Sequence, residues 1–141
     1  MPVASRVVSL GRLQPVPEWL MNEVLKPVLS DLQRPRSVDF ELGVQSSRDG
    51  AGDLVWFSER GGTGAAGHLV SDPSRPRSEL MVEWADWLQE QVFPETQGAW
   101  GQARPACPDH GHPAMATELD GEAWWVCPAN NRRIGRVGHL E

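Results

Sequence analysis

The chain has 141 residues, of which 40% are hydrophobic and 23% are charged, as in an ordinary globular protein. Its net charge of −6 lacks the positive field that binds phosphate backbones, which argues against nucleic acid as a partner. No stretch reaches the ~18 apolar residues of a membrane span, and the first residues lack the apolar core of a signal peptide, so we expect a cytoplasmic protein.

The first predicted element is a helix over residues 17–33. Pro17 suits the first helical position, and apolar residues recur at a spacing of four in two adjacent rows. One row comprises Leu20, Val24, Val28 and Leu32, and the other comprises Met21, Leu25 and Leu29. Pro27 removes a backbone hydrogen bond in the middle, which predicts a kink or two shorter helices.

An antiparallel sheet is predicted over residues 38–70. Residues 38–45 alternate between apolar and polar, and this period of two is typical of a strand with one face in the core. The predicted core face comprises Val38, Phe40, Leu42 and Val44. A turn at 46–52 leads to a returning strand at 54–57, and a glycine-rich turn then leads to a weaker third strand at 68–70.

Residues 78–93 predict a second helix, with Ser78 as its N-cap and Pro94 just beyond its end. Its apolar face comprises Leu80, Trp84, Trp87, Leu88 and Val92. A row of carboxylates follows the same spacing on another face, namely Glu79, Glu83, Asp86 and Glu90. We interpret this row as a solvated face, although it could also meet arginines of the tail or of a basic partner.

The order helix, three strands, helix, hairpin predicts an α+β fold. We expect an antiparallel three-stranded sheet flanked by two helices, with a C-terminal β-hairpin. Residues 1–100 would form the α+β domain, and residues 101–141 would form the hairpin packed on it.

The C-terminal segment carries both cysteines and two of the four histidines. It reads Cys107-Pro108-Asp109-His110-Gly111-His112 and, after an intervening stretch, Trp124-Trp125-Val126-Cys127-Pro128. In a reducing compartment, two cysteines favour thiols or metal ligands over a disulfide. The apolar run before Cys127 predicts a β-strand that delivers the second cysteine.

This segment, about residues 105–137, resembles a zinc ribbon, in which each of two knuckles reads Cys-Pro-x-Cys. Cys107 and His110 occupy the ligand positions of the first knuckle, and Cys127 occupies the first position of the second. Asn130 stands where the fourth ligand is expected. The resemblance implies a structural zinc site with four N or S donors. His112 is our first choice for the fourth ligand, because it projects from the same turn, and His139 is the second. No family is recognised in the rest of the chain.

Other interpretations of the same residues stay open. A site with three protein ligands and a water would have the geometry of a catalytic zinc, with Asp109 and Glu122 as nearby carboxylates in the sequence. Alternatively, the ligand set could be eroded to a metal-free hairpin, or Cys107 and Cys127 could form a disulfide.

Two further motifs are weaker. Residues 62–67 match the G-x-G-x-x-G spacing, but a phosphate site needs a helix at the last glycines, and strand and loop residues follow here. We therefore interpret this segment as a turn. His68, Asp72 and the neighbouring serines do not establish a hydrolytic triad, because a triad is recognised by its spatial geometry.

Trp124 and Trp125 are adjacent, so in a strand their rings should point to opposite faces. One ring should pack on the main domain, and the other should be substantially exposed or covered by a second chain. We therefore expect a non-enzymatic protein with a structural zinc site that mediates protein–protein interaction or assembly, with an unknown protein or a second copy as partner. The alternatives are a nucleic-acid-associated zinc ribbon, which would use Arg132, Arg133 and Arg136, and a metal-dependent hydrolase.

Overall fold

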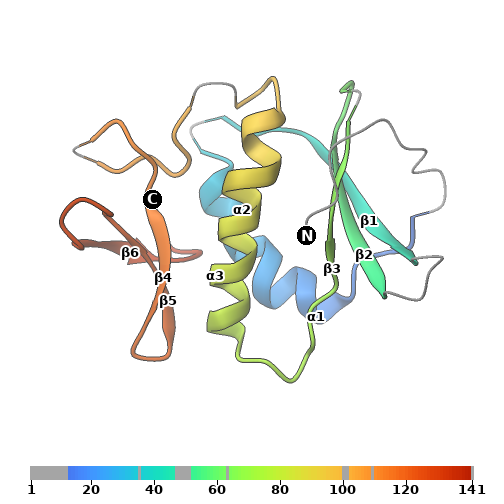
Figure 1. The fold of residues 1–141 in the computed structure, drawn as a ribbon, viewed down its shortest axis with the longest axis horizontal. Coiled ribbons are helices and arrows are strands. Elements are labelled where there is room, and N and C mark those ends of the chain that lie inside the picture. The colour runs from blue at the N-terminus through green and yellow to red at the C-terminus, as the bar shows by residue number, and fades with distance from the viewer. Residues whose placement is uncertain are drawn as a thin grey trace.

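The computed structural model describes residues 13–34, 36–46, 52–62, 64–99, 102–108 and 110–140. Its fold is α+β, with the helices between two antiparallel three-stranded sheets (Figure 1). The first sheet consists of β1 (Phe40–Ser46), β2 (Asp53–Glu59) and β3 (Ala66–Leu69), and the second consists of β4 (Met115–Leu119), β5 (Glu122–Val126) and β6 (Arg133–Arg136). Within the described ranges, none of the helices combines the length and the apolarity that a membrane crossing requires.

The first helical segment consists of α1 (Glu18–Leu20), a π-helical turn η1 (Met21–Leu25) and α2 (Lys26–Leu32). The N–H of Lys26 donates to the carbonyl of Met21, five residues back. Pro27 follows at the start of α2, where its ring would crowd the preceding turn of an ideal α-helix. The wider π turn ends just before this proline, so the expected interruption is present in this form.

The first sheet has the predicted strands and the predicted alternation. Val44 is buried, whereas Asp39 and Glu41 are exposed. The ring of Phe40 lies edge-on to Phe57 at 5.8 Å between centroids, in the geometry that aromatic pairs prefer. One face of this sheet therefore packs on the helices. Part of the predicted turn, residues 47–51, lies outside the described residues.

The second helical segment consists of α3 (Arg77–Trp87), a π-helical turn η2 (Leu88–Val92) and a 3₁₀ turn η3 (Phe93–Glu95). The prediction of Ser78 as the N-cap is wrong, because Pro76 holds that position. Ser78 lies in the first turn of α3, where its hydroxyl donates to Glu118. Pro94 lies inside η3 rather than beyond the helix, at an early position where its missing N–H would have had no partner.

The carboxylate row on α3 is partly neutralised by the loop before it. Arg75 lies 2.8 Å from Glu83 and 3.7 Å from Glu79. Two of the tail arginines pair elsewhere, Arg133 with Asp120 and Arg136 with Glu122. The row is thus mainly a solvated face with its own counter-ion.

The C-terminal segment forms a three-stranded sheet rather than the predicted hairpin, because β6 pairs with β5 on the side opposite β4. Ala116, Ala123 and Trp125 on its inner face belong to the same buried cluster as the helices and the first sheet. The boundary predicted between residues 100 and 101 lies outside the described residues.

The two adjacent tryptophans face opposite ways, as predicted. Trp125 is fully buried. Trp124 on the outer face is only partly exposed, contrary to expectation, because the guanidinium of Arg133 lies 4.9 Å from its ring centroid. Through this cation–π contact, Arg133 covers part of the ring that we expected to be exposed or covered by a second chain.

A buried carboxylate ties the second sheet to the helices. Asp31 of α2 is fully buried, and its Oδ2 accepts hydrogen bonds from the indole Nε1 of Trp125 at 2.7 Å and from the N–H of Gly138 at 2.6 Å. Its Oδ1 accepts from the N–H of Leu140 at 3.3 Å. These bonds fasten β5 and the tail after β6 to α2.

Candidate metal centre

A narrow loop between residues 105 and 114 presents three of the candidate ligands. Ala106 and Pro113 form an isolated antiparallel bridge at its base. The N–H of Cys107 donates to the carbonyl of His112 at 3.1 Å, and the N–H of His110 donates to the carbonyl of Cys107 at 3.1 Å. These bonds fold the loop back on itself, so ligands that are close in sequence are also close in space.

The fourth candidate ligand, Cys127, directly follows β5. Its N–H donates to the carbonyl of Arg132, and its carbonyl accepts from the N–H of Asn131, both at 2.8 Å. The side chain of Asn130 accepts a hydrogen bond from the N–H of Arg132 at 2.9 Å. Asn130, at the position of the missing ribbon ligand, therefore stabilises the turn after Cys127.

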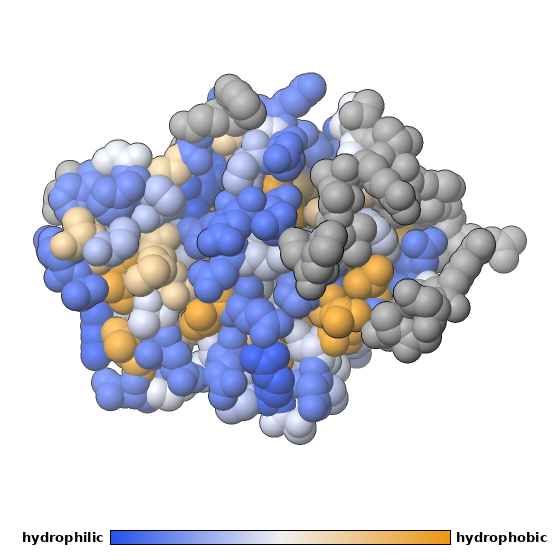
Figure 2. Space-filling model, viewed as in Figure 1, coloured by the Kyte–Doolittle hydropathy of each residue, from blue (hydrophilic) through white to orange (hydrophobic). Residues whose placement is uncertain are grey.

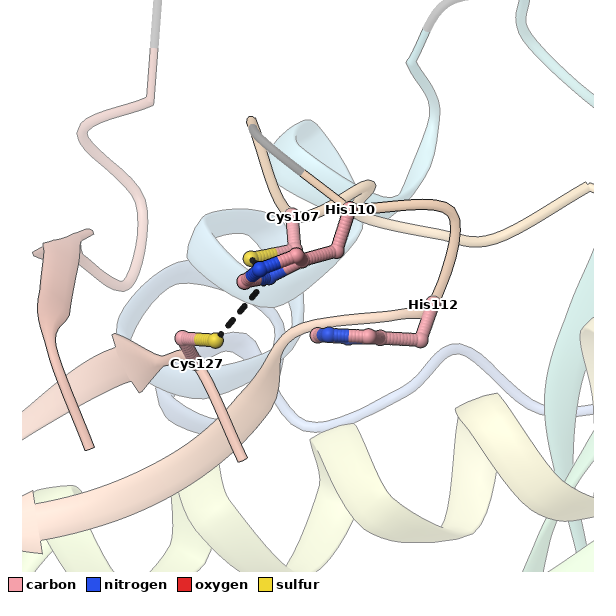
Figure 3. Close-up of side chains that lie close together, drawn as sticks. All are labelled: Cys107, His110, His112 and Cys127. Atoms are coloured by element: carbon pink, nitrogen blue, oxygen red, sulfur yellow. Dashed lines mark hydrogen bonds between the residues drawn. The ribbon is translucent and has the colours of Figure 1, made fainter. Parts of the chain in front are cut away.

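The four side chains converge, as Figure 3 shows. Each of Cys107, His110, His112 and Cys127 offers a ligand atom within 4.8 Å of the others. Nδ1 of His110 lies 3.4 Å from the sulfur of Cys107 and 3.4 Å from the sulfur of Cys127. The two imidazole rings stack with 4.7 Å between their centroids.

The two ring nitrogens of His112 have different surroundings. Its Nε2 is buried and has no hydrogen-bond partner among the residues that the structure describes, whereas its Nδ1 lies 3.3 Å from the carbonyl oxygen of Pro113. A proton on Nδ1 can satisfy that carbonyl and leave the lone pair of Nε2 for a metal. Histidine ligands in metal sites are commonly oriented by such a second hydrogen bond.

The cluster is shielded on the sulfur side and open on the histidine side. Cys107 and Cys127 are buried and are not joined by a disulfide, whereas His110 is exposed. Two thiolates and two imidazoles are donors that a borderline divalent ion accepts. The arrangement can hold one metal ion near the surface.

The alternative ligand and one of the two candidate carboxylates lie outside the cluster. His139 is not part of the cluster. Glu122 begins β5, about 16 Å along the strand from Cys127, and its carboxylate pairs with Arg136 at 2.6 Å. Asp109 lies outside the described residues. Glu122 is therefore not in place to act as a general base at this cluster.

Arg104 anchors the start of the loop between residues 105 and 114, called the metal loop below. Its guanidinium is buried and donates to the carbonyl oxygens of Leu32 at 3.0 Å, Arg36 at 2.6 Å and Gly98 at 3.3 Å. Burial lowers the pKa of this guanidinium, and the neighbouring charge of Arg36 adds to the effect. A planar group with five donors suits this role, because it satisfies several carbonyls at once.

The weaker motifs have structural roles. The glycine-rich segment leads into β3 and not into a helix, and its Thr63 lies outside the described residues. The ring of His68 lies against that of Trp84 with 4.6 Å between centroids and a tilt of 31°, and its Nε2 lies 3.5 Å from the carboxylate of Glu83. The hydroxyl of Ser71 accepts the indole N–H of Trp84 at 2.8 Å. These groups pack against the aromatic core and do not form a triad.

Asp31 and Arg104 were missed by the sequence reasoning. Each is a single charged residue whose partners are distant in the sequence, so neither gives a local signal. No protein family, curated protein or solved structure matches this chain, so its function has to be argued from its own residues.

Proposed function

We propose that Cys107, His110, His112 and Cys127 bind one zinc ion as a structural site. Zinc bonds of about 2.3 Å to sulfur and about 2.0–2.1 Å to nitrogen separate tetrahedral S and N donors by about 3.6 Å. The observation that carries the proposal is the pair of 3.4 Å separations from Nδ1 of His110 to the two sulfurs. The overall spread of 4.8 Å suits a single ion rather than a cluster of metals.

Four protein donors fill a tetrahedral coordination sphere, which is the pattern of structural zinc and not of catalytic zinc with its open position. Zinc bound there would join the loop between residues 105 and 114 to the end of β5. This favours a zinc-ribbon-like, non-enzymatic role, in which the metal fixes the C-terminal sheet and the loop beside it.

The same sheet supports a role in protein–protein interaction or assembly. Its outer patch consists of Met115, Leu119 and Trp124, which cross-strand pairing places on the face opposite the core. Met115 is 42% exposed. Figure 2 shows apolar residues among hydrophilic ones over this end of the molecule. An apolar patch on a rigid sheet is typical of a contact surface for another protein or a second copy.

Metal analysis tests the proposal directly. Protein purified without chelators should contain about one zinc per chain, and cobalt substitution should give the visible absorption bands of a tetrahedral thiolate site. Cys107→Ser and Cys127→Ser should each lose the metal, because the thiolate is the ligand. His139→Ala, which changes a histidine outside the cluster, should retain it. Metal-free wild-type protein, or equal loss in His139→Ala, would contradict the proposal.

A further inference from the structure

A groove of about 830 Å³ lies beside the metal loop. Its wall is built by three segments that are distant in the sequence: the loop between residues 105 and 114, β6 with the tail that follows it, and Arg34, two residues past the end of α2. The lining residues on which the argument rests are Arg34, Ala106, Pro108, Ile134, His139 and Leu140. A volume of this size is in the range of small-molecule sites.

The groove combines apolar walls with one unpaired positive charge. Ala106, Pro108, Ile134 and Leu140 offer aliphatic surface. Arg34 is exposed, and within the described part of the chain its guanidinium has no ion pair and no hydrogen bond. No aspartate or glutamate lines the groove among the described residues. His139, the sequence-based candidate for a fourth metal ligand, lies in this wall.

A second guanidinium, that of Arg104, also lies close to the end of α2. Its donors bond to backbone carbonyls and to Gln102, and to no carboxylate among the described residues. A guanidinium binds a carboxylate or sulfonate through two parallel hydrogen bonds.

We propose that this groove binds a small organic anion. The apolar body of the ligand would lie against Ile134 and Leu140, and its anionic group would pair with Arg34. An uncharged ligand would leave Arg34 without a partner, and a cation would be repelled. Because Ala106 and Pro108 belong to the metal loop, the shape of the groove depends on the structural role proposed for that loop.

The test uses the full chain and two fluorescent probes. 1-Anilinonaphthalene-8-sulfonate is an apolar ring system with one anionic group, and N-phenyl-1-naphthylamine is its uncharged counterpart. We expect the sulfonate to bind at one saturable site. Arg34→Gln should weaken its binding by roughly 10-fold or more, through loss of a charge-assisted pair. The same variant should change binding of the amine by less than about twofold, because it leaves the apolar wall intact.

Two further variants make the result specific. Ala106→Glu places a negative charge at an exposed wall position and should also weaken binding of the sulfonate. Arg60→Gln removes the same charge as Arg34→Gln, but at the end of β2, and should leave binding unchanged. In amide NMR spectra, the sulfonate should shift Gly135 and Leu140 most. Binding that ignores Arg34→Gln, or shifts confined to another surface, would overturn the proposal.

Zinc content is measured on every variant. Arg34→Gln with full zinc and lost sulfonate binding supports the groove. Wild-type protein without zinc but with Arg34-dependent binding would support the groove and contradict the metal site. The two proposals can therefore fail separately.

Discussion

Asp31 is a buried carboxylate whose donors, within the described part of the chain, are neutral groups and not cations. It accepts the indole N–H of Trp125 and the backbone N–H groups of Gly138 and Leu140. Hydrogen bonds to a charged acceptor are stronger than neutral ones, and a buried donor that loses its acceptor costs free energy. One side chain of α2 thus determines how β5 and the tail sit on the helices.

Asp31→Ala should lower the free energy of unfolding by about 3 kcal/mol, because it leaves buried donors on Trp125 and Gly138 unsatisfied. Urea denaturation followed by tryptophan fluorescence measures this loss. Asp39→Ala removes a carboxylate that is 74% exposed and paired with Arg60 at 3.3 Å. That matched control should change stability by less than about 0.5 kcal/mol. Equal losses in the two variants would show that Asp31 has no special role.

His68 predicts a dependence of stability on pH. Burial lowers its pKa in the folded state, although Glu83 opposes the shift. The unfolded chain therefore binds a proton at a higher pH than the folded chain does. Stability should fall as the pH drops through the unfolded-state pKa of about 6.5, and the fall should level off below the folded-state pKa.

His68→Gln should reduce this loss of stability between about pH 7.5 and pH 5.5, because glutamine does not titrate. The measurement is the difference in unfolding free energy between the two pH values, in each protein. All other side chains are common to both proteins, so subtracting the two differences isolates His68. An unchanged pH dependence in the variant would contradict the prediction.

At the scale of elements, the pairing at the edge of β1 requires glycine at position 43, because glycine has no side chain. Gln14 pairs with Val44 through backbone hydrogen bonds of 2.8 and 2.7 Å. A Cβ atom on Gly43 would lie 2.5 Å from the Cβ of Leu13 and 2.9 Å from the carbonyl oxygen of Gln14. Glycine at position 43 thus lets the segment before α1 approach β1 closely.

Gly43→Ala should displace this segment and lower stability by about 1–3 kcal/mol. Thermal denaturation gives the loss, and faster hydrogen exchange at the Gln14 amide would locate it. Gly111→Ala is the matched control, because a Cβ there would meet no described residue within 4 Å. A similar loss in both variants would point to a general cost of removing glycine and not to the close approach.

Elements with a regular period were predictable from the sequence. In the first helix and in β1, apolar residues recur at the period of the element because one face packs in the core. Such a pattern can be recognised in the sequence. Three of the candidate metal ligands were predictable because they share one short loop. His112 rather than His139 joins the cluster for the same reason.

Other features had no such signal. β6 contains two arginines and a glycine among its four residues, so no apolar alternation marks it. The bonds of Arg104 to Leu32 and of Asp31 to Gly138 span 72 and 107 residues. A local pattern cannot encode partners at such distances, so these contacts were found only in the structure.

At the scale of the whole molecule, one buried cluster includes side chains from both sheets and from the helices between them. Removal of zinc should therefore lower the midpoint of a single unfolding transition, and it should not melt the C-terminal sheet alone. Calorimetry and circular dichroism with and without a chelator measure this, and added zinc should reverse it. Two separate transitions in the chelated protein would contradict the expectation.

The long reach of Asp31 also has a consequence for synthesis. A ribosome makes the chain from its N-terminus, so α2 emerges well before Trp125, Gly138 and Leu140 are polymerised. Until then, the carboxylate of Asp31 lacks its native donors, and water has to solvate it. The nascent helices therefore cannot complete their native packing before these three residues have been made. Closure of the core has to wait until the segment with Trp125, Gly138 and Leu140 has left the exit tunnel.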